Sequence, residues 1–345
     1  MNNTIMFKEI MGQPKNIEDC HNYNVGEIQV IAAAIKDFKP QNIVFVGRGT
    51  SIHAGIYARY LFELYYHIPV SIASQSVFTA YNSYTNMSKS LVIGISQSGS
   101  GNDTLAVMKK AKELGALTVS IVNNLESDIA ASSDYALYCN AGLTEALPAT
   151  KTFTTTLYLI NALVYALTGE EKLNVSKDVI KSAIEKGFEY QENLKEKVGL
   201  FKDAKSMFTL GRGLTLPLAM ETALKIKETS HIHVSSYPIA EFYHGPIAMI
   251  NKEIPVIVFG IEKEFEEDVR NILIRLKARE IPTLLITNND NLTEENDNYI
   301  YVKAESVIEA FFTSIVIVQL LACELALLKG YNPDSDKELL NIKTF

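Results

Sequence analysis

The sequence contains the same strand-turn-helix pattern twice. An apolar run ends in Gly47-Arg48-Gly49 and precedes a helical pattern, and a second run ends in Gly211-Arg212-Gly213 before another helical pattern. Short buried strands that alternate with helices need right-handed crossovers, so the pattern predicts open parallel sheets. The two helices are expected over residues 51–66 and 216–229.

A second correspondence extends this repeat. A strand that ends at Asn123-Asn124 matches one that ends at Asn288-Asn289, at nearly the same offset as the two glycine turns. We therefore expect an α/β protein of two homologous lobes, each a mainly parallel sheet flanked by helices in a three-layer, flavodoxin-like arrangement. Chance repetition of strand-helix-strand units is the alternative. The expected boundaries are residues 1–170 for the first lobe with an N-terminal helical arm, 171–200 for a helical linker, and 201–345 for the second lobe with its tail.

Charge and hydropathy exclude several classes of partner. The net charge of −8 is spread among interspersed acidic and basic residues, which disfavours nucleic acid and anionic membrane surfaces. The longest apolar stretch, Ala310–Leu328, contains Gln319 and Glu324, so it predicts a buried helix rather than a membrane span. The N-terminus has no signal-like apolar segment, and a cytoplasmic location is expected.

A loop rich in serine and glycine follows a predicted strand that ends at Ile95. It runs from Ser96 to Thr104 and leads into a helical pattern. Unpaired N–H groups in the first turn of a helix, together with hydroxyl donors, bind phosphate without a lysine. The loop fits neither a nucleotide P-loop nor a dinucleotide fingerprint, so a small phosphorylated molecule is expected. An ordinary capped turn is the alternative.

The matching segment of the second lobe is acidic. Residues 261–268 carry five carboxylates, which would repel phosphate, so only the first lobe should bind the anion. Ligands of doubly wound sheets lie outside the carboxyl ends of the strands. The turn that contains Gly49, Thr50 and Ser51 should therefore border the same crevice.

The second lobe also holds candidate acid/base groups. Glu221, Lys225 and Glu228 lie on one face of the predicted 216–229 helix, at i, i+4 and i+7. Apolar neighbours favour a buried set in which a carboxylate serves as a general base, and a solvated ion pair is the alternative. His244, just before Gly245-Pro246, could transfer a proton to or from a sugar ring oxygen, or serve only as a cap or surface residue.

No metal site or cofactor is expected. His231 and His233 would share one face of a strand, but no acidic or cysteine partner has suitable spacing, which favours packing roles. Cys20, Cys139 and Cys323 are widely separated and are expected to be free thiols.

Six motifs, taken together and in their order along the chain, resemble those of the SIS (sugar isomerase) family. The resemblance is to the branch that contains the isomerase half of glucosamine-6-phosphate synthase and the stand-alone glucosamine-6-phosphate deaminases. The motifs cover almost the whole chain: Gly47-Arg48-Gly49-Thr50-Ser51-x-His53-Ala54-Gly55, Ile95-Ser96-Gln97-Ser98-Gly99, Ala149-Thr150-Lys151-x-Phe153-Thr154, Leu210-Gly211-Arg212-Gly213, Leu224-Lys225-x-Lys227-Glu228 and Glu241-x-x-His244-Gly245-Pro246.

The resemblance implies roles for individual residues. Glu228 would move the proton between C1 and C2, supported by Lys225 and Glu221, and His244 of a neighbouring subunit would open the ring, which implies a homodimer with shared active sites. The residues implied to hold the phosphate and nearby sugar hydroxyls are Ser51, Ser96, Gln97, Ser98 and Thr104, bordered by Gly49, Thr50 and Ala149.

Three positions depart from the family pattern. Gly101 stands where relatives often have Ser or Thr, and Ala149 stands where the synthase has Ser. The tail keeps Asn332-Pro333-Asp334 but lacks the usual Leu-x-Lys spacing, so Lys343 either replaces the tail lysine in a shifted register or that role is lost.

The resemblance implies a sugar phosphate as the small-molecule partner. Since no glutaminase nucleophile precedes Cys20, we expect conversion of glucosamine 6-phosphate to fructose 6-phosphate and ammonia, through ring opening and C1–C2 proton transfer. Cleavage of amino-acid conjugates of fructose 6-phosphate, a deglycase reaction, is the close alternative. The second alternative is a sensor that binds a sugar phosphate and catalyses no reaction.

Overall fold

The computed structural model describes residues 3–335 and contains two five-stranded sheets. All neighbouring strands are parallel. The first sheet consists of β1 (Asn42–Val46), β2 (Val70–Ile72), β3 (Ser90–Ser96), β4 (Leu117–Val122) and β5 (Tyr135–Tyr138). The second consists of β6 (Ser206–Gly211), β7 (His233–Pro238), β8 (Val256–Gly260), β9 (Thr283–Thr287) and β10 (Tyr299–Tyr301). We call each sheet with its helices a lobe.

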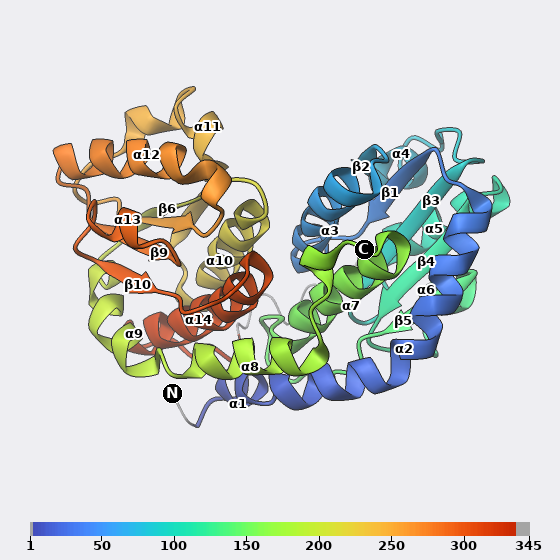
Figure 1. Cartoon of the computed structure of the whole chain (residues 1–345), viewed down its shortest axis with the longest axis horizontal. Coiled ribbons are helices and arrows are strands. Elements are labelled where there is room, and N and C mark those ends of the chain that lie inside the picture. The colour runs from blue at the N-terminus through green and yellow to red at the C-terminus, as the bar shows by residue number, and fades with distance from the viewer. Residues whose placement is uncertain (1–2, 336–345) are drawn as a thin grey trace. The chain divides into compact units, whose positions relative to one another are not determined.

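The two sheets have the same topology. The first runs β2-β1-β3-β4-β5, and the second, read from its other edge, runs β7-β6-β8-β9-β10. This is the order of a flavodoxin-like sheet, with the change of direction between the first and third strands of each lobe. The predicted α/β fold of two homologous lobes is confirmed (Figure 1).

Helices cover both faces of each sheet, because successive strand residues point to opposite sides. Those before β6 are α1 (Ile5–Met11), α2 (Gln13–Phe38), α3 (Thr50–Leu61), a π-helical turn η1 (Phe62–Tyr66), α4 (Gln75–Thr79), α5 (Asn102–Glu113), α6 (Asp128–Ser132), α7 (Lys151–Thr168), η2 (Glu171–Leu173), α8 (Lys177–Phe188), α9 (Gln191–Lys197) and η3 (Val198–Phe201). Those after β6 are α10 (Thr215–Ser230), α11 (Ile239–Phe242), η4 (Pro246–Met249), η5 (Lys263–Phe265), α12 (Glu266–Ala278), α13 (Asp290–Thr293) and α14 (Val307–Leu328).

Equivalent helices occupy equivalent faces in the two lobes. In the first, Val107 and Met108 of α5 pack on the face that presents Val44 and Val92, while Gly55 of α3 approaches Phe45 on the other face. In the second, α12 covers one face and α10 packs on the other. Both lobes therefore have three layers, with α3 corresponding to α10 and α5 to α12.

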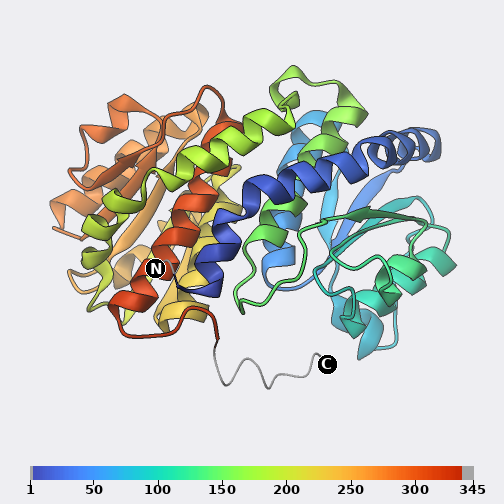
Figure 2. The same cartoon turned by 90° about the horizontal axis from the view of Figure 1, so that it is seen from below.

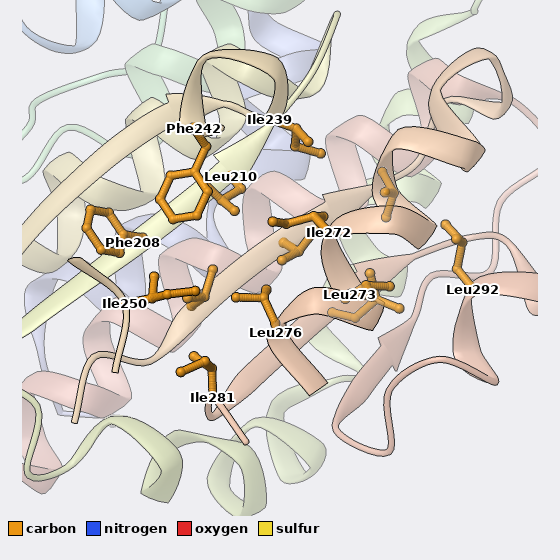
Figure 3. Close-up of a cluster of buried hydrophobic side chains, with 14 residues drawn as sticks. Phe208, Leu210, Ile239, Phe242, Ile250, Ile272, Leu273, Leu276, Ile281 and Leu292 are labelled. Atoms are coloured by element: carbon orange, nitrogen blue, oxygen red, sulfur yellow. The ribbon is translucent and has the colours of Figure 1, made fainter. Parts of the chain in front are cut away.

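A cluster of buried apolar side chains fills the core between α12 and the second sheet. Side chains from β6, α11 and α12 converge there, among them Leu210, Phe242 and Leu276 (Figure 3). Phe208 and Phe242 meet edge to face, with ring centroids 5.2 Å apart. This cluster packs against one face of the second sheet, and α10 with its polar residues packs against the other face.

The predicted buried helix within the apolar stretch is confirmed as α14. Among the described residues it is the one helix long and apolar enough to cross a membrane, with a mean hydropathy of 2.2, yet 83% of its most apolar window is buried inside the protein. It packs against α9 and α10 within the second lobe (Figure 2). A long apolar helix buried in this way is accounted for by the core of the lobe.

The chain forms two compact units that are discontinuous in sequence. One contains the second sheet together with the N-terminal part up to Pro14, Thr144–Thr150 and the chain from Asp178. The other contains the first sheet, with Lys15–Leu143 and Lys151–Lys177. The boundaries at residues 170 and 200 stay a prediction, and each unit is described by itself below.

Candidate functional site

In the first lobe, two loops meet at the carboxyl edge of the sheet. β1 and β3 are neighbours, and they lead through Gly47-Arg48-Gly49 into α3 and through residues 97–101 into α5. This is the point at which strand order reverses, where doubly wound folds bind ligands. Of the predicted residues, Ser96 ends β3, and the others lie on these two loops or at the start of α3: Gly49, Thr50, Ser51, Gln97 and Ser98.

Both helices begin at a glycine, which offers no side chain as a cap. The N-cap positions are Gly49 for α3 and Gly101 for α5, and neither helix has a side-chain hydrogen bond at this position. Since glycine supplies no cap, no N-cap side chain competes with an anion for the first-turn N–H groups. A phosphate at these two helix starts stays a prediction.

The loop after β3 is fixed by its own hydrogen bonds. Ser96 Oγ accepts a hydrogen bond from the Gly99 N–H at 3.1 Å, and the hydroxyl oxygens of Ser98 and Ser100 are 2.8 Å apart. Gly99 has a φ of +69°, and a Cβ there would lie 2.1 Å from Ser127 Oγ. A side chain at this position would collide with Ser127, so the loop requires glycine here.

Thr104 occupies a different place from the other predicted phosphate ligands. Its side chain is buried, with 4% exposure, and lies beneath Gly101. Gln97 and Ser98 are exposed. Direct phosphate contact is therefore easier for the exposed loop residues than for Thr104, which packs under the loop.

The equivalent position in the second lobe is closed by a carboxylate. Glu262 follows β8 and accepts a hydrogen bond from the Thr215 N–H, at 3.3 Å, at the start of α10. Burial raises the pKa of Glu262 from 4.5 to about 7, against the lowering effect of backbone hydrogen bonds from Thr215 and Leu214. An internal carboxylate therefore occupies the helix start that corresponds to the glycine-capped start of α3.

The predicted acid/base set is present on α10 and is largely buried. Lys225 Nζ lies 2.5 Å from Glu228 Oε2 and 3.4 Å from Glu221 Oε1. The side chains of Lys225 and Glu221 are 0% and 1% exposed, whereas that of Glu228 is 22% exposed. A solvated surface pair is excluded, and Glu228 is the member of the set that reaches solvent.

The environment keeps Lys225 protonated. Burial by itself lowers the pKa of Lys225, but the charges and hydrogen bonds of Glu221 and Glu228 outweigh burial, and the pKa is raised from its usual value. A permanently charged ammonium between two carboxylates holds the Glu228 carboxylate in place.

His244 lies on an exposed turn after α11. Its backbone N–H donates to the Glu241 carbonyl at 3.0 Å, and Gly245 follows with a φ of +146°. The exposed imidazole is free of the core that surrounds Lys225. The histidine pair is split, because His231 ends α10 with a φ of +52° while His233 begins β7, so a shared strand face for both rings is wrong.

Two further predicted residues, Ala149 and Lys343, lie outside the loops of the first lobe in the sequence. Ala149 is half-buried in the irregular segment before α7. Lys343 lies outside the described residues. The Asn-Pro-Asp motif that precedes it has a structural partner, since Asp334 accepts hydrogen bonds from the N–H groups of Ile5 and Met6 at 2.9 and 2.7 Å.

The sequence did not predict the contacts of three residues around these sites. Glu262 closes α10, Asp334 caps α1, and Asp103 forms an ion pair with Arg48. For Asp103 there was a signal, since the offset of the repeat relates Asp103 to Asp268 and Arg48 to Arg212. Among residues 3–335, no three His, Cys, Asp or Glu side chains form a metal-binding group, and all three cysteines are free and buried.

Comparison with known proteins gives one consistent match. The SIS domain model matches residues 38–166 and 200–329. A glutamine--fructose-6-phosphate aminotransferase [isomerizing] of Sulfurisphaera tokodaii is 34% identical over 347 residues, which cover 98% of this chain and 56% of that protein. The chain thus spans about half the length of the curated relatives it matches.

Solved structures agree. The C-terminal domain of glucosamine-fructose-6-phosphate aminotransferase from Francisella tularensis has a TM-score of 0.87 and 26% identity, and covers 97% of this chain and 98% of that one. Glucosamine-6-phosphate deaminase from Thermotoga maritima shares the fold, with a TM-score of 0.75, 20% identity, and coverage of 96% and 97%.

Proposed function

Since the chain belongs to the SIS family, we propose that it is a phosphosugar isomerase/deaminase that converts glucosamine 6-phosphate and water to fructose 6-phosphate and ammonia. The observation that carries the proposal is the buried Lys225, 2.5 Å from a partly exposed Glu228 carboxylate. A protein that only binds a sugar has no need for such a charge cluster, whose burial costs desolvation energy.

In the proposed reaction, the first lobe binds the phosphate and the second supplies the acid/base groups. First-turn N–H groups of α5 and the hydroxyls of Ser51, Ser96 and Ser98 hold the phosphoryl oxygens. The exposed His244, from a neighbouring subunit of a homodimer, gives a proton to the ring oxygen as the ring opens.

Glu228 then performs the isomerisation. Its carboxylate takes the proton from C2 of the open-chain amino aldehyde and returns a proton to C1, while O1 gains a proton and the amino nitrogen loses one, which leaves a hydroxyl on C1 and an imine at C2. Water adds to that carbon, and the amine leaves as ammonia, giving the ketose. Lys225 and Glu221 keep Glu228 oriented during both transfers.

The test is a product assay with purified protein. Glucosamine 6-phosphate should yield ammonia and fructose 6-phosphate in equal amounts, and glucosamine without phosphate should react at least a hundredfold less efficiently, because it lacks the group that the first lobe binds. The Glu228→Gln variant should fold and lose activity. Full activity in that variant would exclude the proposed role of Glu228.

The same assay distinguishes the alternatives. Faster release of an amino acid from fructosamine 6-phosphate conjugates than of ammonia from glucosamine 6-phosphate identifies a deglycase. Formation of glucosamine 6-phosphate from fructose 6-phosphate and ammonia shows the direction named for the aminotransferase relatives. Tight binding of these sugars without turnover identifies a sensor.

A further inference from the structure

An arginine-aspartate ion pair occurs at the same place in both lobes. In the first, Arg48 of the loop after β1 pairs with Asp103 in the first turn of α5. In the second, Arg212 of the loop after β6 pairs with Asp268 in the first turn of α12, with Nη1 and Oδ2 2.8 Å apart. The pair therefore belongs to the duplicated unit itself.

The Arg48 guanidinium is held from a second side as well. Its Nε donates to Gln75 Oε1 at 3.2 Å, and Gln75 Nε2 donates to the Gly47 carbonyl at 2.6 Å. Gln75 is buried, with 8% exposure. Arg48 thus connects the loops after β1 and β2 to the start of α5.

Asp103 is unfavourable for an anion site unless it is neutralised. A carboxylate in the first turn of α5 adds negative charge close to the helix N-terminus, where it would repel a bound phosphate. The side chain of Asp103 is only 17% exposed, so solvent screens this charge incompletely. Arg48 supplies the compensating charge through its ion pair with Asp103.

We propose that Arg48 is a positioning residue of the phosphate site: it neutralises and orients Asp103, and keeps the loops after β1 and β3 in the geometry that receives the phosphate, without contacting the phosphate itself. This inference rests on the proposed function for the identity of the ligand. It adds a residue whose effect is on phosphate affinity rather than on proton transfer.

The second lobe provides a matched control. Its Arg212-Asp268 pair has the same chemistry, but Glu262 closes the helix start that corresponds to α3. Arg212→Met removes an equivalent pair from a lobe in which no phosphate is expected. Both pairs are partly exposed, and exposed pairs contribute little to stability, so neither variant should unfold.

The experiment compares Arg48→Met, Asp103→Asn, the double variant and Arg212→Met in the full chain. The dissociation constant for inorganic phosphate is measured by calorimetry, and KM and kcat are measured for glucosamine 6-phosphate. Arg48→Met should weaken phosphate binding tenfold or more and raise KM similarly, with kcat changed less than threefold. The dissociation constant and KM of the double variant should return to within threefold of the wild-type values. Those of Arg212→Met should stay within twofold of wild type.

Two results would overturn the proposal. One is wild-type phosphate affinity in Arg48→Met. The other is a double variant as weak as Arg48→Met, because that would mean that the guanidinium contacts the phosphate directly.

A ligand-free measurement separates this inference from the proposed function. Amide hydrogen exchange of residues 96–104 should be faster in Arg48→Met than in wild type and unchanged in Arg212→Met. If wild type binds no phosphate, the proposed function fails, and the exchange rates still decide whether Arg48 orders the loop. Unchanged exchange in Arg48→Met would exclude the positioning role.

Discussion

A lysine with a fully buried side chain needs counter-charges, and α10 supplies two to Lys225. The helical spacing alone puts Glu221 and Glu228 on the same face, one turn to either side. Helical spacing does not predict burial. In the structure the Lys225 ammonium is buried, whereas the Glu228 carboxylate that it contacts is partly exposed to solvent. The residue-scale predictions follow from this difference.

Replacement of Lys225 should lower the free energy of unfolding. Lys225→Met leaves two carboxylates facing each other with no positive charge between them, which typically costs about 3–5 kcal/mol of unfolding free energy. The second substitution Glu221→Gln should recover at least about 1 kcal/mol of it, because one charge is then removed. Urea denaturation measures both. A loss below about 1 kcal/mol in Lys225→Met would contradict the burial argument.

Gly101 should accept a serine. Its φ of −68° suits any residue, and a Cβ there would lie 3.7 Å from Thr104 Oγ1, which is ordinary contact. The new hydroxyl is positioned to donate to the phosphate, so Gly101→Ser should tighten binding of inorganic phosphate by about threefold to tenfold. Calorimetry measures it, with Gly26→Ser as the control because Gly26 has open space around its Cβ position. Weaker binding in Gly101→Ser would count against the assigned site.

At the scale of elements, the sequence predicts best those that adjoin a glycine turn. The helix expected over residues 216–229 is α10, Thr215–Ser230, because apolar spacing and the preceding Gly213 define it well. The flavodoxin-like arrangement predicts the strand order of each lobe, but not the register of neighbouring strands, since an apolar run indicates burial and not which residues pair. Glu262 was expected only as part of an acidic segment, because its contact with Thr215 joins residues 47 positions apart.

Glu262 should make the stability of α10 and its lobe depend on pH. Because its folded-state pKa, about 7, lies above the ordinary value of 4.5, the folded state binds the proton more tightly than the unfolded state. Its contribution to stability is therefore present below about pH 4.5 and is lost as pH rises through about 7. The loss should be at most about 3 kcal/mol.

The measurement is the difference in unfolding free energy between wild type and Glu262→Gln at pH 5 and pH 8. The amide keeps an acceptor for the Thr215 N–H and cannot ionise. The unfolding free energy of the variant should therefore rise relative to that of wild type as pH rises. Glu253→Gln, an exposed change in the same lobe, is the control. A difference independent of pH would show that Glu262 ionises normally.

At the scale of the whole molecule, one ancestral unit has diverged into two lobes with different chemistry. The sheet order and the arginine-aspartate pair are retained in both. The N-cap of α3 is a glycine that makes no side-chain hydrogen bond, whereas Glu262 accepts a hydrogen bond from the start of α10. The repeat in the sequence predicts the common fold, while the difference between the lobes depends on single side chains at the carboxyl edges of the sheets.

This difference predicts one phosphate site per chain. Titration of the wild-type protein with fructose 6-phosphate should give a stoichiometry near one, because an internal carboxylate occupies the corresponding place in the second lobe. Calorimetry at two ionic strengths measures the stoichiometry and separates specific from weak binding. Two equivalent sites per chain would show that the second lobe is also open.

The most direct test of the account follows the transferred proton in D₂O. Wild-type protein with glucosamine 6-phosphate should form fructose 6-phosphate that carries deuterium at C1, because Glu228 exchanges its proton with solvent between the two transfers. Glu228→Gln should lose at least about a thousandfold in rate, consistent with removal of a general base, while Glu253→Gln, an exposed change in the same lobe, should behave as wild type. Deuterium incorporation and turnover in Glu228→Gln at the wild-type rate would contradict the central claim.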